Sequence, residues 1–359
     1  MDRRSFGKLF GVGVGVTGAA AASTAGVHSV SEAWATAGRG APAGGDVSAE
    51  ETEAGAGSSF GPLKQIRAGE LNVGYAEAGP AHGPVALLLH GWPYDIHSYE
   101  AATPLLTAHG YRVIVPYLRG YGTTTFLSPK TPRNGEQAAV AMDIIALMDA
   151  LHIDRAVIGG FDWGGRTADI IAAQWPERCK ALVSMGGYLI LNQKALRQPA
   201  PPAKEYPFWY AYYFCTDRGE LGLKEYRHDL AKLVWHTASP TWRFSDATFD
   251  RTAKAFDNPD YVPVVISNYR WRLELAPTDP RYADLEARLA EGPAIRVPTV
   301  GLDGELDPFT PSGGDSSYRD KYTGPYVHRT LKGIGHNVPQ EAPAAFAQAV
   351  LEADRMARG

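Results

Sequence analysis

The sequence predicts an α/β fold in which helices cover a mainly parallel sheet, with a helical segment inserted in the second half of the chain. Short apolar runs end in glycine turns, helix-period segments alternate with them, and one region breaks this rhythm. Continuous apolar runs are typical of parallel strands, which are buried on both faces. The predicted strands are residues 85–90, 111–116, 156–161, 181–184 and 299–302, and the predicted helices are residues 138–151 and 167–174.

The region that breaks the rhythm, residues 191–293, is dense in aromatic side chains. Its polar and apolar residues fit short helices rather than strands, so we expect a helical lid between core segments 60–190 and 294–359. Open α/β sheets bind ligands beyond the carboxyl ends of their strands. An insertion that leaves from those ends would cover the ligand site.

The first 59 residues differ in composition from the rest of the chain. Residues 1–35 combine Arg3 and Arg4, a short Gly/Ala-rich apolar run and Ala-Trp-Ala at 33–35, which together predict a twin-arginine export signal. Residues 36–59 are rich in Gly, Ala, Ser and Glu, and we expect a disordered linker there. The sequence therefore predicts a periplasmic or secreted protein that passes through the export machinery. A retained N-terminal anchor is the alternative.

Composition and motifs argue against several classes of function. The formal net charge is −4, so no basic face indicates a nucleic-acid partner. The two cysteines, Cys179 and Cys215, are too few for a disulfide framework, and we expect two separate thiols. The histidines show no metal-ligand spacing, and no glycine-rich phosphate loop occurs. We therefore expect neither a metal nor a cofactor.

A carboxylate stands at the end of the predicted strand 156–161, in the sequence Gly160-Phe161-Asp162-Trp163-Gly164. Small residues on both sides permit a very sharp strand-to-helix turn that pushes the central side chain outward. With Ser at its centre, this pattern is a nucleophile elbow. A carboxylate is also a competent nucleophile, so Asp162 is predicted to attack carbon and form an ester. An Asp that merely caps a helix is the plainer alternative.

Candidate partners for Asp162 follow later in the chain. Asp307 lies in a loop after the strand 299–302, and His336 lies in the loop before the final helix. Nucleophile, acid and histidine thus occur in the order of a hydrolase triad. Asp303 is a second candidate for the acid. The backbone N–H groups of Trp92 and Trp163 are predicted to form an oxyanion hole; the plainer reading of His90-Gly91-Trp92-Pro93 is an ordinary strand-ending turn.

With these motifs the chain resembles the α/β-hydrolases that use an aspartate nucleophile, whose best-known members are epoxide hydrolases and haloalkane dehalogenases. The resemblance begins near residue 61 and implies Asp162 as nucleophile, His336 as base and Asp307 as orienting acid. The motifs that carry it are His90-Gly-Trp-Pro93, Arg119-Gly-Tyr-Gly122, Gly160-Phe-Asp-Trp-Gly164, Gly304-Glu-Leu-Asp307 and Gly335-His336.

Two tyrosines of the predicted lid favour the epoxide hydrolases. The segment 208–214 resembles the one that carries their first lid tyrosine and implies Tyr210. Ser267-Asn-Tyr269-Arg resembles the segment that carries the second and implies Tyr269, although this tyrosine follows the asparagine directly. An epoxide oxygen leaves as an alkoxide, so acidic hydroxyl donors suit it. The expected product is a vicinal diol.

A haloalkane dehalogenase remains an alternative, because indole N–H groups suit a leaving halide and Trp163 follows the nucleophile directly. Another hydrolytic reaction on this scaffold and a non-catalytic binder of small molecules are further alternatives. We expect Trp92, Trp163 and Phe214 to contact substrate. The aromatic lid predicts a small apolar or aryl substrate, with water as the second reactant.

Overall fold

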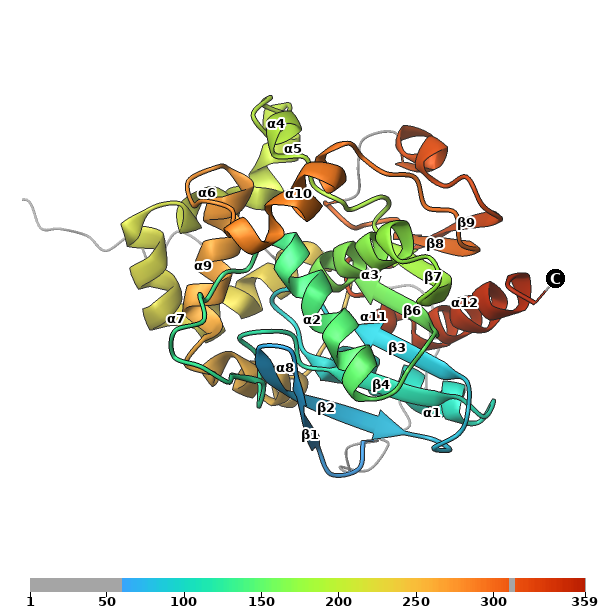
Figure 1. The fold of residues 1–359 in the computed structure, drawn as a ribbon. Helices are drawn as coiled ribbons and strands as arrows, with labels where there is room; N and C mark the ends of the chain where they lie inside the picture. Colours follow the sequence, from blue (N-terminus) through green and yellow to red (C-terminus); the bar gives the residue numbers. More distant parts are fainter. Residues whose placement is uncertain (1–59, 310–313, 359) are drawn as a thin grey trace, which may run out of the picture. The chain divides into compact units, whose positions relative to one another are not determined.

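The computed structural model describes residues 60–309 and 314–358. Within them, a nine-stranded sheet has the order β1-β2-β4-β3-β6-β7-β8-β9, and β5 pairs with β2 (Figure 1). The predicted export signal 1–35 and linker 36–59 lie outside the described residues and stay predictions. The strands are β1 (Lys64–Ala68), β2 (Leu71–Ala78), β3 (Val85–Leu89), β4 (Arg112–Pro116), β5 (Thr125–Phe126), β6 (Ala156–Phe161), β7 (Cys179–Met185), β8 (Thr299–Gly304) and β9 (Tyr326–Leu331).

The centre of the sheet is parallel, as predicted. Strands β4, β3, β6, β7, β8 and β9 pair in parallel, whereas β1, β2 and β5 form antiparallel pairs at one edge. The apolar runs of the parallel strands are buried, and Leu87, Leu88 and Leu89 of β3 have no exposed surface. Strands that are buried on both faces have continuous apolar sequences, and these runs are the reason that the sequence predicted the strands.

Helices lie on both faces of the sheet (Figure 1). Helices α2 (Gln137–Ala150) and α3 (Asp162–Gln174) contact each other, and α1 (Ala102–Thr107) and α12 (Pro343–Met356) likewise form a contacting pair. Helix α3 ends before Trp175-Pro176, as predicted, but it begins at Asp162 rather than Thr167. The glycines after Asp162 belong to its first turn, because close packing against the sheet needs residues without a side chain there.

The segment between β7 and β8 is helical, as the sequence predicts. We call residues 191–293 the helical insertion. Its helices lie next to one another on one side of the sheet in Figure 1. Its α-helices are α4 (Gln193–Leu196), α5 (Pro202–Glu205), α6 (Trp209–Phe214), α7 (Asp217–Ala238), α8 (Asp246–Ala253), α9 (Tyr261–Arg272) and α10 (Ala283–Ala290).

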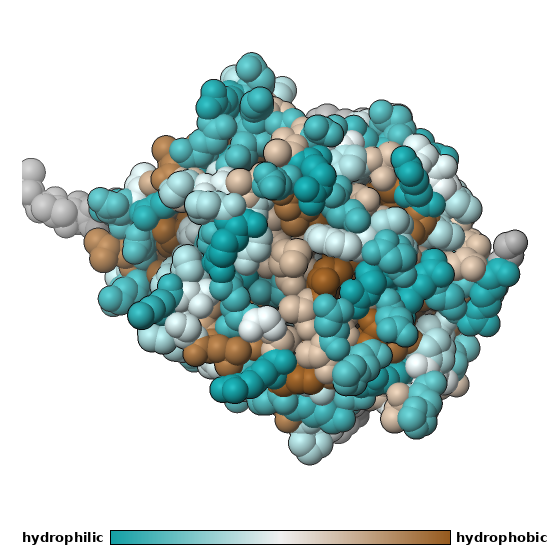
Figure 2. Space-filling model, in the orientation of Figure 1, coloured by the Kyte–Doolittle hydropathy of each residue, from teal (hydrophilic) through white to brown (hydrophobic). Residues whose placement is uncertain are grey.

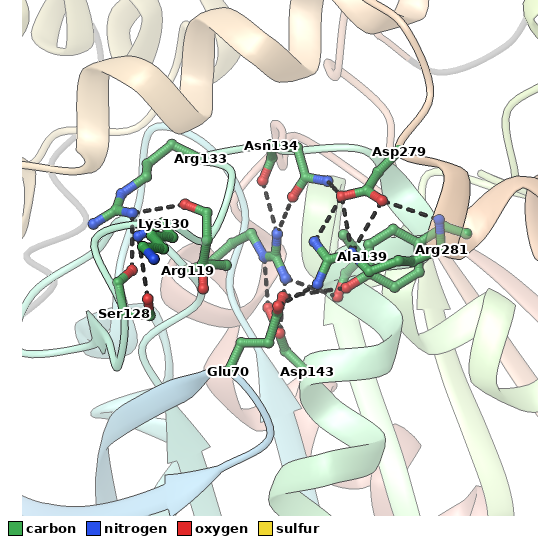
Figure 3. Close-up of polar contacts among 12 residues, drawn as sticks. Glu70, Arg119, Ser128, Lys130, Arg133, Asn134, Ala139, Asp143, Asp279 and Arg281 are labelled. Atoms are coloured by element: carbon green, nitrogen blue, oxygen red, sulfur yellow. Dashed lines mark hydrogen bonds and ion pairs between the residues drawn. The ribbon is translucent and has the colours of Figure 1, made fainter.

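A buried arginine joins the loop after β4 to helix α2. Arg119 Nε donates a 2.6 Å hydrogen bond to Asp143 Oδ2, and its Nη1 donates to the backbone oxygen of Asn134 at 2.9 Å (Figure 3). Beside it, Arg281 of the helical insertion forms an ion pair with Glu70 (Figure 3). Breaking a buried ion pair costs about 3–5 kcal/mol. This cost applies to the Arg119–Asp143 pair within the core, whereas the pair that reaches the insertion, Arg281–Glu70, is more exposed.

Both cysteines are free thiols, as predicted. Polar side chains cover much of the face drawn in Figure 2, with smaller apolar areas between them. In the part of the chain that the structure describes, no helix combines the length and the apolarity needed to cross a bilayer.

Candidate active site

Asp162 sits at the sharp turn between β6 and α3 that the sequence predicts. Its φ angle is 52°, in the left-handed region of backbone conformation that residues other than glycine rarely adopt. A Cβ atom on Gly164 would lie 2.0 Å from the Leu89 carbonyl oxygen, and one on Gly160 would lie 2.4 Å from the Gly164 backbone. Only glycine fits at these two positions. Such stored backbone strain is typical of functional sites.

The structure brings the three predicted triad residues together. His336 Nδ1 lies 2.8 Å from Asp307 Oδ2, a hydrogen bond that orients the ring. On its other side, His336 Nε2 lies 3.9 Å from Asp162 Oδ2. This distance is too long for a direct hydrogen bond, so Nε2 is free to act on a molecule that enters between them.

Asp303, the second candidate for the acid, lies elsewhere. Its Oδ2 accepts hydrogen bonds from the Tyr318 hydroxyl at 2.8 Å and contacts His328 Nε2 at 2.9 Å. It is therefore part of a cluster on the β8–β9 side of the sheet. Of the two candidates, only Asp307 contacts His336.

Charged neighbours control the protonation of His336. Burial lowers the pKa of the imidazole, but the charge of Asp307 and its hydrogen bond outweigh burial and raise the pKa above the ordinary value. Asp162 raises it further. The histidine is thus a stronger base than a buried imidazole without carboxylate neighbours would be.

Two residues that the sequence motifs do not mark hold the histidine loop. The backbone N–H of His336 donates to Ser239 Oγ at 3.0 Å, and this hydroxyl donates to Glu341 Oε1 at 2.6 Å. Glu341 also accepts from the backbone N–H groups of Gly335 at 2.8 Å and Asn337 at 3.0 Å. Ser239 belongs to the helical insertion, so the insertion helps to set the position of His336.

The backbone after β3 provides a donor to Asp162. The N–H of Trp92 donates a 2.7 Å hydrogen bond to Asp162 Oδ1. This bond leaves Oδ2 as the oxygen nearer to His336. Trp163, the other predicted oxyanion donor, is the second residue of α3, where the first backbone N–H groups of a helix lack intrahelical acceptors.

A cavity of about 440 Å³ opens next to the triad. Residues of the helical insertion, of α3 and of the loops after β7, β8 and β9 line it together. Its wall is mainly apolar, and the polar residues Asp162, Asp307, His336, Tyr210 and Tyr269 all belong to it. The apolar part includes Leu189, Ile190, Leu191, Phe208, Leu273 and Phe309.

Tyr210 and Tyr269 meet edge to face in this wall, with ring centroids 5.7 Å apart. Both tyrosines line the cavity that Asp162 and His336 also line. Burial raises the pKa of both phenols above the ordinary value, although the charge of Arg272 opposes this rise. Both hydroxyls are therefore protonated at neutral pH and can donate to a ligand.

The side chains of Trp92, Trp163 and Phe214 do not line this cavity. All three are buried behind it, and Trp92 packs against Tyr210, Phe214 and Tyr269 with ring centroids 4.7 to 5.6 Å apart. The structure thus places them as support for the two tyrosines. The predicted substrate contacts of these three side chains are not present in the cavity wall.

The comparison with known families agrees with this geometry. A family model described as alpha/beta hydrolase fold matches residues 84–327. This chain belongs to the α/β-hydrolase family. A candidate epoxide hydrolase from Klebsiella pneumoniae, known as a crystal structure, is 56% identical to this α/β-hydrolase and superposes with a TM-score of 0.81. The match covers 83% of this chain and 99% of the other.

Curated relatives of this α/β-hydrolase are also named epoxide hydrolases. "Epoxide hydrolase 3" of Siraitia grosvenorii is 37% identical over 114 residues, which cover 32% of this chain and 35% of the relative. The chain thus matches about a third of the length of that protein. "Epoxide hydrolase A" of Mycobacterium tuberculosis is 25% identical over 306 residues, which cover 77% of this chain and 92% of the relative.

In the described residues of this α/β-hydrolase, no group of three or more His, Cys, Asp or Glu side chains could hold a metal ion. The chemistry that the cavity offers there is a strained carboxylate, an imidazole paired with a second carboxylate, and two phenol donors. These are the elements of nucleophilic and acid–base catalysis.

Proposed function

We propose that this α/β-hydrolase opens epoxides to vicinal diols through an ester on Asp162. The observation that carries the proposal is a single cavity lined by Asp162, His336 and two protonated tyrosines. The helical insertion acts as a lid, because it contributes Tyr210 and Tyr269 to the wall. The names of the relatives support the same reaction.

In the first step, Asp162 Oδ2 attacks a ring carbon of the epoxide from the back. The carbon–oxygen bond of the ring breaks, and its oxygen develops negative charge that the hydroxyls of Tyr210 and Tyr269 stabilise by hydrogen bonds and proton donation. Asp162 Oδ1, held by the Trp92 N–H, becomes the carbonyl oxygen of the ester. The product of this step is a covalent hydroxyalkyl ester.

In the second step, His336 Nε2 takes a proton from water, and the hydroxide attacks the ester carbonyl carbon. Negative charge then develops on Oδ1, where the Trp92 N–H already donates a hydrogen bond and the Trp163 N–H is the proposed second donor. The ester bond breaks, the imidazolium of His336 gives its proton to the departing alkoxide, and the diol leaves. The Asp162 carboxyl group formed in this way loses its proton, which restores the carboxylate and the phenol that gave a proton in the first step. Asp307 stabilises the imidazolium that forms in between.

The donors in the cavity favour an epoxide over a haloalkane. The haloalkane alternative relies on indole N–H donors for the halide, and the indoles of Trp92 and Trp163 lie outside the cavity wall. An alkoxide needs hydroxyl donors, and two are present in that wall. The apolar part of the wall suits a hydrocarbon or aryl substituent on the epoxide.

The direct test is a pair of turnover assays with the purified protein, one on an aryl epoxide and one on a haloalkane. We expect diol formation from the epoxide and little halide release from the haloalkane. Asp162→Ala removes the nucleophile and is expected to abolish diol formation. Halide release without diol formation would assign the site to dehalogenation. Absence of both products, with epoxides of carboxylic acids included among the substrates, would contradict the proposed reaction and leave another hydrolytic reaction or a non-catalytic binder.

The kcat–pH profile provides a second test, because His336 acts as a base only when it is neutral. Activity is expected to fall as the pH falls through the pKa of His336, which Asp307 raises. In Asp307→Asn the charge is lost while burial remains, so this acid limb should move to lower pH. The maximal rate should fall by about 10⁴, as for the equivalent change in a serine triad. A lower rate with an unmoved acid limb would contradict the proposed role.

A further inference from the structure

Two arginines line the same cavity without a carboxylate partner. Arg166 of α3 is buried, with 6% of its surface exposed, and its Nε donates to the Leu189 backbone oxygen at 3.1 Å. Arg272, the last residue of α9, has its Nε and Nη2 atoms buried without hydrogen-bond partners. Among the described residues, neither guanidinium forms an ion pair. Buried charges in proteins are normally paired, but the nearby carboxylates of Asp162 and Asp169 act on Arg166 without forming an ion pair with it.

Arg119, the other buried arginine among the described residues, shows how a carboxylate partner changes the pKa of a guanidinium. Arg119 is bonded to Asp143, and this partner outweighs burial and raises the pKa of Arg119. Burial and the nearby charge of Arg272 instead lower the pKa of Arg166 to about 9. Asp162 and Asp169 oppose this fall only in part, and burial raises the pKa of Asp169 itself to about 7.

Each arginine lies one helical turn from a residue of the proposed reaction. Arg166 follows Asp162 by four residues on α3, and Arg272 follows Tyr269 by three residues on α9. Residues at these spacings share one face of a helix. The Arg272 guanidinium lies over the Tyr269 ring, 4.7 Å from its centroid. Any anion held by both arginines would therefore sit beside the reacting carbon.

We propose that Arg166 and Arg272 form a carboxylate-binding subsite, so that the preferred substrates are epoxides of unsaturated carboxylic acids. This proposal rests on the proposed function and specifies its substrate class. The carboxylate binds between the two guanidinium groups, and the apolar substituent contacts the wall formed by residues such as Leu189 and Phe208. Ester formation neutralises Asp162, and the bound carboxylate then supplies the remaining negative charge beside Arg166.

The experiment compares matched anionic and neutral compounds. Phenylglycidate and phenylglycidamide share the ring and the epoxide and differ in a carboxylate against a neutral amide. We expect wild-type kcat/KM to be at least about tenfold higher for the acid, since a hydrogen bond between charged groups contributes that much. Arg166→Met and Arg272→Met should each reduce this ratio by about tenfold, toward one. Arg218→Met, at an exposed arginine on α7 outside the cavity, should leave the ratio unchanged.

A binding measurement separates this proposal from the proposed function. Cinnamate and cinnamamide lack the epoxide, so calorimetric titration of the wild-type protein with each reports the subsite without catalysis. Tighter binding of cinnamate, lost in Arg272→Met, is the expected result, and it does not depend on an Arg166 variant that folds. Equal affinity for both compounds, with epoxide turnover intact, would overturn the subsite alone. Tighter cinnamate binding without turnover of any epoxide would instead overturn the proposed function and leave the subsite standing.

Discussion

His336→Gln is expected to accumulate the covalent ester that the wild-type protein hydrolyses. Asp162 attacks the epoxide without help from a base, so the first step proceeds in this variant. Hydrolysis needs His336 Nε2 to take a proton from water, and loss of a general base costs about 10²–10⁴ in rate. Mass spectrometry after incubation with an aryl epoxide should therefore find one added substrate mass on the peptide that contains Asp162.

Two controls make this result specific. His109→Gln changes an exposed histidine on the core, far in sequence from the triad, and should keep wild-type turnover without any adduct. The double variant Asp162→Ala, His336→Gln should show neither turnover nor adduct. An adduct on another carboxylate, or full turnover by His336→Gln, would be incompatible with the proposed order of steps.

The periodicity of the sequence predicted the parts of the fold that are buried on both faces. Strand β6 and helix α2 were predicted to within one residue at each end, because continuous apolar runs and helical stripes mark such elements. Strands β1, β2, β5 and β9 were missed. β1 and β9 are edge strands that leave several residues exposed, and β5 has only two residues. Edge strands lack the apolar run that identifies a central one.

In the candidate site, the sequence predicted the features that depend on neighbouring residues and missed those that depend on residues far apart in the chain. The elbow at Asp162 and the chain order of Asp307 and His336 could be read from local motifs. The pairing of Ser239 with the His336 loop joins residues 97 positions apart, and no local pattern encodes it. The same holds for Arg166 beside Arg272, which lie on α3 and α9. The sequence also does not give the direction of a side chain: Trp92, Trp163 and Phe214 were predicted to contact substrate, whereas all three are buried and none lines the cavity.

Tyr210→Phe and Tyr269→Phe are each expected to lower kcat/KM for a neutral aryl epoxide by about 10²–10³, the usual cost of removing one donor to a developing oxyanion. Each change deletes one hydroxyl and keeps the aromatic ring that packs against Trp92. Tyr206→Phe is the matched control, because Tyr206 belongs to the insertion, is 78% exposed and lies outside the cavity wall. Rates are measured from diol formation, with circular dichroism as a check on folding.

The step at which the tyrosines act can be resolved by combining these changes with the histidine variant. In the His336→Gln background, the rate of ester accumulation reports ring opening alone, since hydrolysis is blocked. Adding Tyr210→Phe or Tyr269→Phe should slow that accumulation by the same factor that each change imposes on kcat/KM. Unchanged ester formation would mean that the two hydroxyls do not stabilise the leaving oxygen. The donor for that oxygen would then have to be sought among the other polar groups that line the cavity, which include Arg166 and Arg272.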